Sequence, residues 1–415
     1  MQTHIRRSSV RGRIITAVVV IVIIALGVIQ LVRPVAAAKL QQTVPASAKV
    51  QGTPVAIQWP KQGQAALAVS GVGLIGNVGP QTPVPIASVT KIMTAYLVLK
   101  AHPLAEGQDG PTLTITADDV RQYEQDKAAG QSVVQVQAGE KLTERELLEA
   151  LLLPSANNAA DLLAAWTAGS KQAFVAEMNQ TAKKLGMNHT HYADASGVNP
   201  ATVSTAVDQL KIAEKAMAIP AFRETVAMKQ ASLPVAGVQY NVDYALGKSG
   251  IIGVKTGSTD EAGGCFVFAT EHTVAGKPAL VLGVVLGQQG NNSSNSELMT
   301  ALTEGESLSL QSGKILQAVS PVKAGQTVGM IDTGWQAPVP VVVSKSANLV
   351  AWQGMPVTMK LLQKPNLTQV AAGEQVGTLE IRAGQQVVNL PVRAAHAIQR
   401  PSLVWRLERV PFMHR

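Results

Sequence analysis

The sequence predicts an α+β protein in which an antiparallel sheet carries a helical subdomain and a small all-β domain follows. Helical patterns dominate residues 88–218, and runs of β-branched and aromatic residues gather between 251 and 286. Beyond about Ser320 the chain changes to short β-rich runs separated by Gly and Pro. With 415 residues, the chain is expected to form two folded domains rather than one core.

The first segment, residues 1–39, has the features of a signal peptide or a membrane anchor. Four arginines precede the apolar run Ile14–Val32. As a helix this run is roughly 28 Å long, about the thickness of a bilayer core. The arginines favour the cytoplasmic side, which places the rest of the chain outside the membrane. Ala36–Ala38 offers a cleavage site, and both removal and retention of the helix remain open.

Residues 40–60 are small and polar and are expected to form a spacer. The apolar stretch Ala65–Gly76 predicts a strand and a turn. Ser88–Ala101 predicts a helix that is apolar on nearly every face and therefore buried. Thr143 and Glu146 have capping-box spacing and predict the start of a helix that ends before a proline.

Two more helices are expected over residues 158–168 and 208–218. Strands are expected at Ile251–Val254, Cys265–Ala269 and Ala279–Leu286, where β-branched and aromatic residues are frequent. Helices early in the chain and strands late in it are typical of an α+β domain.

The predicted domains are residues 40–319, a β-sandwich-like domain at 320–400 and a basic tail at 401–415. Val322–Asp332 and Val370–Glu380 repeat one pattern of a turn followed by a strand. One repetition is too few for a solenoid, so a small domain of two sheets is expected. In the tail, the apolar residues of Ser402–Val410 share a helical face with neighbouring arginines, so this segment can lie on a membrane surface or form a last strand.

The charge distribution argues against nucleic-acid binding. The net charge is +8, but residues 1–39 carry +6 and residues 393–415 carry +4, so the segment between them carries −2. Basic ends fit anionic lipid, and no basic stripe with interleaved aromatic residues is present. No cofactor or metal is expected, because His189 and His191 lack the companions of a zinc motif. Cys265, the single cysteine, lies in an apolar run and is expected to be a buried hydrophobic residue.

Ser88 and Lys91 form the first of three motifs that predict chemistry. Their i, i+3 spacing at a helix start places both side chains on one face. A serine hydroxyl needs a base to accept its proton, and a desolvated lysine can be neutral and act as one. Taken alone, the pattern fits a solvated surface pair better.

The second motif is Ser155-Ala156-Asn157, between two predicted helices, where the serine can relay a proton and the asparagine can bind an amide. The third is Lys255-Thr256-Gly257, at the end of a predicted strand. There a charge and a hydroxyl can hold an anionic group, and Gly257 permits close approach to the strand. Each motif alone is weak, because such residues are common in loops and turns.

The order of the three motifs is more specific than any one of them. SxxK, SxN and KTG follow one another behind an export signal, each on the element its chemistry requires. A closely similar trio marks penicillin-binding proteins and class A β-lactamases. The sequence therefore predicts a serine acyl-transfer enzyme, and no histidine lies in a frame typical of a histidine-based triad.

Residues 50–400 resemble the low-molecular-mass penicillin-binding D-alanyl-D-alanine carboxypeptidases, the serine peptidases of family S11. The resemblance includes the segments around the second and third motifs, Ala195-Ser196-Gly197, and Ser204-Thr205-Ala206 with Asp208. It implies a penicillin-binding or β-lactamase-like fold and a β domain at the position found here.

The resemblance also implies a mechanism. Ser88 would attack the carbonyl between two terminal D-alanines of a peptidoglycan stem peptide while Lys91 accepts its proton. Backbone N–H groups of Ser88 and Ser258 would form the oxyanion hole. Ser155 would help to protonate the departing D-alanine.

Lys255 and Thr256 would hold the substrate carboxylate, with Asn157 and Gly257 completing the binding site. Water would then release the acyl group, whereas penicillins would acylate Ser88 and leave slowly.

Two positions depart from the family pattern. Ser258 stands where some relatives have histidine, which matters little because the backbone N–H is the group required. Gln289 stands where many members place an arginine for the terminal carboxylate. An endopeptidase or β-lactamase on the same fold, or a wall-binding protein with a vestigial site, are the alternatives. No motif supplies the second base that a β-lactamase needs.

Overall fold

The computed structural model describes residues 8–409 apart from 106, 291–295 and 366. Two compact units divide the chain. The larger unit contains residues 51–318 and 350–354, and the smaller unit contains the chain up to residue 50, residues 319–349 and everything from 355 onward. β14 (Gln317–Val319) and β17 (Leu349–Ala351) occur where the chain passes from one unit to the other.

A five-stranded antiparallel sheet is the centre of the larger unit. Its strand order is β11-β12-β13-β3-β4. The bounds are Gln64–Val69 for β3, Gly73–Val78 for β4, Ile251–Thr259 for β11, Gly263–Val274 for β12 and Lys277–Gln288 for β13. The predicted early strand and turn thus become two strands that pair with β13, with their turn at residues 70–72 rather than at Gly76. Because β11 is at the sheet edge, one side of this strand is free of sheet partners.

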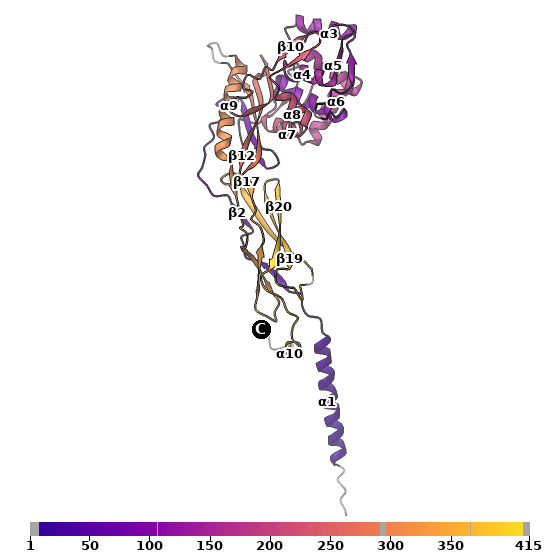
Figure 1. The fold of residues 1–415 in the computed structure, drawn as a ribbon, viewed down its shortest axis with the longest axis vertical. Helices are drawn as coiled ribbons and strands as arrows, with labels where there is room; N and C mark the ends of the chain where they lie inside the picture. Colours follow the sequence, from indigo (N-terminus) through magenta and orange to yellow (C-terminus); the bar gives the residue numbers. More distant parts are fainter. Residues whose placement is uncertain (1–7, 106, 291–295, 366, 410–415) are drawn as a thin grey trace, which may run out of the picture. The chain divides into compact units, whose positions relative to one another are not determined.

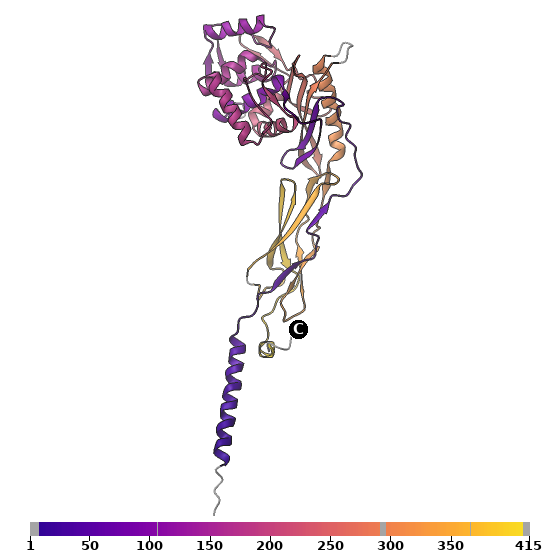
Figure 2. The same cartoon turned by 180° about the vertical axis from the view of Figure 1, so that it is seen from behind.

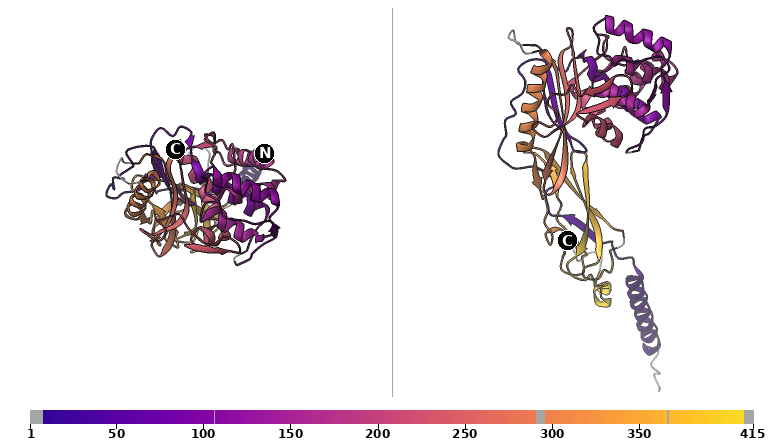
Figure 3. Two further views of the ribbon diagram at one scale, coloured as in Figure 1. Left: turned by 90° about the horizontal axis from the view of Figure 1, so that it is seen from above. Right: turned by 45° about the horizontal axis from the view of Figure 1, so that its top comes forward.

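Helices cover both faces of this sheet, as Figures 1 and 3 show. α9 packs against β12 and β13 on one face, and α7 packs against β13 and β3 on the other, together with the remaining helices. The helices of this unit are η1 (Ala87–Thr90), α2 (Lys91–Ala101), α3 (Ala117–Ala128), α4 (Glu144–Leu152), α5 (Asn157–Ala168), α6 (Lys171–Lys184), α7 (Ala206–Met217), α8 (Pro220–Val226) and α9 (Glu297–Ile315). The predicted α+β architecture is confirmed.

Three short strand pairs complete the larger unit: β5 (Val84–Pro85) with β8 (Val203–Ser204), β6 (Thr112–Thr114) with β7 (Lys141–Thr143), and β9 (Gln230–Leu233) with β10 (Gly237–Tyr240). The predicted capping box is present at α4, where Thr143 accepts from the backbone of Glu146 and Glu146 accepts from the backbone of Thr143. The predicted apolar helix corresponds to η1 and α2. Eight of the eleven residues of α2 are buried, as a helix with no polar face requires.

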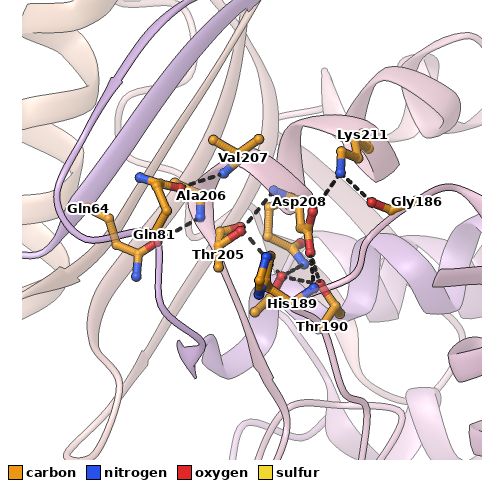
Figure 4. Close-up of polar contacts among 12 residues, drawn as sticks. Gln64, Gln81, Gly186, His189, Thr190, Thr205, Ala206, Val207, Asp208 and Lys211 are labelled. Carbon is orange, nitrogen blue, oxygen red and sulfur yellow. Dashed lines mark hydrogen bonds and ion pairs between the residues drawn. The ribbon is translucent and has the colours of Figure 1, made fainter. Parts of the chain in front are cut away.

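The start of α7 is fixed by side chains from several segments (Figure 4). The side chain of Thr205 accepts from the backbone N–H of Asp208 at 3.1 Å. The N–H groups of the first two residues of the helix, Ala206 and Val207, donate to the side chains of Gln64 and Gln81, respectively. The Asp208 carboxylate in turn accepts from the backbone of His189 at 2.8 Å. These bonds supply the partners that the first turn of a helix lacks, so α7 is tied to the sheet strand β3 through Gln64.

The smaller unit is built on one sheet of seven strands in the order β1-β15-β16-β20-β19-β18-β2, whose later strands are the yellow and orange ones in Figure 2. Its strands are β1 (Lys39–Gln42), β2 (Ser47–Lys49), β15 (Thr327–Asp332), β16 (Val339–Val343), β18 (Pro356–Gln363), β19 (Gln375–Ala383) and β20 (Gln386–Ala394). One prediction differs from this structure. Part of the expected spacer forms the two edge strands of this sheet, Lys39–Gln42 and Ser47–Lys49. Hydrogen bonds link all seven strands in one continuous order, and β1 also contacts β18 near the other end of that order.

The repeated segments form equivalent structures in the smaller unit, because Gly325 and Gly373 both take positive φ (80° and 77°) shortly before β15 and β19. The tail forms a helix, α10 (Leu403–Glu408), and not a strand; Val410 lies outside the described residues. Its apolar side chains are exposed, and Arg406 donates to the Leu31 carbonyl at the end of α1 (Ser8–Val32). α1 is long and apolar enough to cross a membrane by length and composition.

Candidate active site

The first two motifs meet at the ammonium group of Lys91. Ser88 lies within η1 and Lys91 begins α2. Lys91 Nζ donates to Ser88 Oγ at 2.7 Å and to Asn157 Oδ1 at 2.6 Å. Ser155 Oγ, in the loop before α5, is 3.3 Å from the same nitrogen. Four predicted site residues from two distant segments therefore form one hydrogen-bonded cluster.

Burial changes the acidity of the lysine in this cluster. The side chain of Lys91 is completely inaccessible to solvent, whereas Ser88 is partly exposed. Desolvation, followed by the charge of Lys255, holds the pKa of Lys91 well below its usual value. Desolvation therefore favours the neutral amine of Lys91, whose free electron pair can accept the proton of Ser88 across 2.7 Å.

The backbone is strained immediately before Ser88 and at Ser155. Ala87, immediately before Ser88, has φ 46°, and Ser155 itself has φ 68°. Residues with a Cβ rarely adopt this left-handed region, at a cost of about 1–3 kcal/mol each. Strain of this kind persists where the surrounding structure enforces it, and here it coincides with the two hydroxyl groups near Lys91.

The third motif lies inside β11 and not at its end as the sequence suggested, because β11 continues to Thr259. β11 passes directly beside the nucleophile segment. A Cβ at Gly257 would be 2.8 Å from the backbone nitrogen of Ser88 and 3.1 Å from that of Val89. Only glycine allows this approach, so Gly257 brings the free side of the edge strand against the backbone N–H groups at the start of η1.

Lys255 and Thr256 are both buried in this strand, at 1% and 3% exposure, while Ser258, after the buried Gly257, is exposed. Burial lowers the pKa of Lys255 to about 7, an effect that the carboxylate of Asp243 partly opposes. Lys255 Nζ donates to the backbone carbonyl of Thr256 at 3.1 Å. A cation held in a strand at this pKa is suited to bind an anionic group that restores its charge.

Two features of the site were not predicted from the sequence. Gln131 accepts from Asn157 Nδ2 at 2.8 Å and so fixes the orientation of that amide. Gly197 (φ 83°) lies so close to the Ala87 carbonyl that a Cβ there would be 1.8 Å away. Gln131 belongs to no motif. Ala195-Ser196-Gly197 was noticed only as part of the family resemblance, and its contact with the residue before Ser88 is tertiary.

Gln289 directly follows β13 and is exposed. Its side-chain nitrogen lies beside Gly263, where a Cβ would be 2.9 Å from it. The residue therefore lies near the turn between β11 and β12, at the end of β11 that carries Ser258.

Comparison with known proteins places this geometry in a family. Residues 73–290 match Peptidase S11, D-alanyl-D-alanine carboxypeptidase. The D-alanyl-D-alanine carboxypeptidase of Streptomyces sp. strain K15 is 36% identical over 217 residues, which are 48% of this chain and 71% of that protein. The D-alanyl-D-alanine carboxypeptidase DacF of Bacillus subtilis is 25% identical over 308 residues, 71% of this chain and 75% of the relative.

Solved structures agree. The D-alanyl-D-alanine carboxypeptidase DacD of Francisella tularensis has a TM-score of 0.57 at 23% identity, over 85% of this chain and 96% of that one, and supports the fold. A variant of the Streptomyces K15 DD-transpeptidase has a TM-score of 0.51 at 30% identity, over 60% of this chain and 96% of that one. Together with the matched segment, which covers more than half of the sequence, these likenesses identify the chain as a member of the S11 family of serine peptidases, the D-alanyl-D-alanine carboxypeptidases.

Proposed function

We propose that this protein removes the terminal D-alanine from peptidoglycan stem peptides through an acyl-enzyme on Ser88. The observation that carries the proposal is the position of the buried Lys91 Nζ, 2.7 Å from Ser88 Oγ and also bonded to Ser155 and Asn157. Serine acyl transfer requires a nucleophile within hydrogen-bonding distance of a base that can accept its proton, and the burial of Lys91 lowers its pKa and so favours the neutral form.

In the first step, neutral Lys91 accepts the proton of Ser88, and Ser88 Oγ forms a bond to the carbonyl carbon between the two D-alanines. The C–N bond then breaks, and the departing amine needs a proton. Ser155 is placed to pass one from Lys91, because its Oγ is 3.3 Å from Nζ. Asn157 holds the ammonium form of Lys91 through Oδ1 at 2.6 Å.

The carbonyl oxygen becomes negatively charged during this step. Backbone N–H groups of Ser88 and Ser258 are assigned to bind it, since Gly257 places β11 against the Ser88 backbone. Lys255 and Thr256, on the same strand, are assigned to the terminal carboxylate of the substrate. Without an arginine at Gln289, this carboxylate depends on Lys255, whose pKa of about 7 a bound anion would raise.

Water completes the cycle by cleaving the ester, which returns the proton to Ser88 and releases the shortened peptide. A β-lactam ring offers the same carbonyl to Ser88, but its leaving group stays attached and hinders water. Penicillins are therefore expected to label Ser88 for a long time.

The proposed location is the outer face of the cytoplasmic membrane, with peptidoglycan as the partner. α1 is suited to hold the chain there, and the exposed apolar side chains of α10 (Leu403, Val404 and Leu407) are suited to an additional contact with lipid. Both assignments rest on composition and exposure.

A D,D-endopeptidase is the second candidate function. The D-alanyl-D-alanine endopeptidase of Escherichia coli is 29% identical over 256 residues, which are 59% of this chain and 78% of that protein.

The test begins with the full-length protein, a pentapeptide stem and a cross-linked stem dimer. Release of D-alanine from the pentapeptide, abolished in Ser88→Ala, supports the carboxypeptidase, and cleavage of the dimer alone supports the endopeptidase. Mass spectrometry after penicillin treatment should place the adduct on the peptide that contains Ser88. A folded protein that cleaves neither substrate and carries no adduct would contradict both functions.

A further inference from the structure

The C-terminal helix α10 contacts the outer end of α1 within the smaller unit. We propose that α1 is a permanent part of the folded protein and is not removed as a signal peptide, because α10 clamps its end. The inference rests on the proposed location at the membrane and goes beyond it, since it decides between cleavage and retention of the N-terminal helix.

The end of α1 has backbone carbonyls that the helix itself cannot bond. The last carbonyls of an α-helix have no N–H group one turn further on. The Ile29 carbonyl still accepts from the N–H of Arg33 at 3.0 Å. The Gln30 carbonyl cannot be bonded in this way, because Pro34, four residues later, has no N–H to donate. The carbonyls that follow Ile29 therefore need donors from another segment.

Two arginines of the C-terminal segment supply these donors. Arg406 donates to the Leu31 carbonyl at 2.9 Å. Arg409 donates at 2.8–3.2 Å to three further carbonyls, those of Gln30, Arg33 and Pro34. Positive charges are also favourable at this end of a helix, where the dipole is negative. The two arginines thus stabilise the end of α1 by hydrogen bonds and by charge.

Side chains of the two helices meet as well. Among the residues of α1 whose side chains the structure describes, the partly covered ones share one helical face: Gly27, Gln30 and Leu31. A Cβ at Gly27 would be in ordinary contact with Leu407, 3.9 Å from its Cδ2. Gln30 Oε1 and Arg409 Nε are buried and have no hydrogen-bond partner among the described residues. The junction between the helices is therefore closed to solvent at these atoms.

α10 is in turn fixed to the rest of the smaller unit. Ser402 caps the helix by accepting from the N–H of Trp405 at 3.1 Å. Trp405 packs edge-on against Trp335, with 5.9 Å between the ring centroids, and Trp335 Nε1 donates to the Gln399 carbonyl at 2.7 Å. The guanidinium of Arg409 lies over the Trp405 ring, 5.4 Å from its centroid. These contacts connect α1 with the segment that follows β15.

The possible cleavage site after Ala38 belongs to the folded structure. Ala38 is 2% exposed, and its carbonyl accepts from Gln363 Nε2 at 2.7 Å. The N–H of Leu40 donates to Oε1 of the same side chain at 2.9 Å. The bond between Ala38 and Lys39 thus lies between two hydrogen bonds to β18, where a peptidase has no access to it. Removal of residues 1–38 would also leave the arginines of α10 without their carbonyl acceptors.

The mass of the mature protein tests retention. The full chain is produced in a bacterial host with an active signal peptidase and purified in detergent from its membranes. We expect the mass of the uncleaved chain, 43.5 kDa. A mature protein that begins at Lys39 would overturn the inference.

A disulfide cross-link tests the clamp itself. Gly27→Cys is combined with Leu407→Cys, and Cys265→Ala removes the native thiol. Oxidation by copper phenanthroline should join the tryptic peptides from the two ends of the chain. Gly12→Cys with Leu407→Cys is the matched control, because Gly12 lies in the same helix roughly 22 Å away by the helical rise, with nothing within 4 Å of its Cβ position. An uncleaved, folded protein in which the Gly27 pair forms no more cross-link than the Gly12 pair would overturn the clamp.

Substitution of the arginines tests their part in the clamp. Arg406→Gln with Arg409→Gln should slow the Gly27–Leu407 cross-link by about tenfold or more, as expected when charge-assisted hydrogen bonds are lost. Arg393→Gln with Arg400→Gln removes the same charge from the same unit, at arginines whose bonded partners lie outside α1, and should leave the rate unchanged. Equal rates in the two double variants would refute the clamp by arginines.

Penicillin labelling separates these outcomes from a failure of the proposed function. Ser88 lies in the larger unit, so labelling should be the same in wild type and in both double arginine variants. Loss of labelling in the wild type would reject acyl transfer at Ser88, whereas the mass and the cross-link report on α1 without any turnover.

Discussion

Replacing Gly257 with alanine tests how closely β11 must approach the nucleophile. The new Cβ would be 2.8 Å from the Ser88 nitrogen, 3.1 Å from the Val89 nitrogen and 3.2 Å from Ala87 Cβ. Ordinary contact begins at 3.4 Å, so strand and nucleophile segment must separate by about 0.6 Å in a tightly packed region. Gly257 does not have a positive φ, so the expected defect comes from this contact and not from backbone strain.

A separation of this size misplaces the oxyanion donors with respect to the carbonyl. We expect the second-order rate of acylation by a fluorescent penicillin to fall by about 10²–10³-fold, the cost of losing one donor of an oxyanion hole. The free energy of unfolding should fall by only about 1–3 kcal/mol, as for other cases of overpacking. Ser258→Ala is the contrasting substitution, because it keeps the backbone N–H and changes only an exposed side chain. A folded Gly257→Ala protein that acylates at the wild-type rate would refute the reasoning.

Three further predictions concern the lysines and a helix cap. Lys91→Ala and Lys91→Arg should each reduce penicillin acylation by about 10³-fold or more without unfolding the protein, because neither side chain can accept the Ser88 proton; retained labelling would exclude Lys91 as the base. Since burial lowers the pKa of Lys255 to about 7, Lys255 loses its charge as the pH rises through that value. The kcat/KM for a peptide with a free terminal carboxylate should therefore fall above pH 7. The same peptide with its C-terminal carboxylate converted to an amide should not show this fall. Identical pH profiles for the two peptides would contradict the assignment of Lys255 to the carboxylate. Thr143→Ala removes the acceptor for the Glu146 N–H and should lower the free energy of unfolding by about 1 kcal/mol in urea titrations, with penicillin acylation unchanged.

The fold could be predicted where local patterns are strong. The capping box at Thr143, the apolar helix behind Ser88 and the places of the late strands follow from spacing and residue type. The strands β11 and β12 are about twice as long as expected. α9 was missed because Gly305 and Gly313 weaken a helical pattern. In the structure, Gly305 lets the helix approach Phe266, where a Cβ would be 2.4 Å away. The edge strands β1 and β2 were missed because polar residues at a sheet edge resemble a linker.

The sequence alone determined which residue types enter the chemistry and in what order, because SxxK, SxN and KTG are local patterns that can be read without coordinates. Tertiary structure decided what those residues can do. Burial lowers the pKa of Lys91, the left-handed backbone at Ser155 turns a loop serine toward that amine, and Gly257 joins a strand to a helix start about 170 residues earlier. Desolvation and close approach depend on segments far apart in sequence, so no local pattern can encode them.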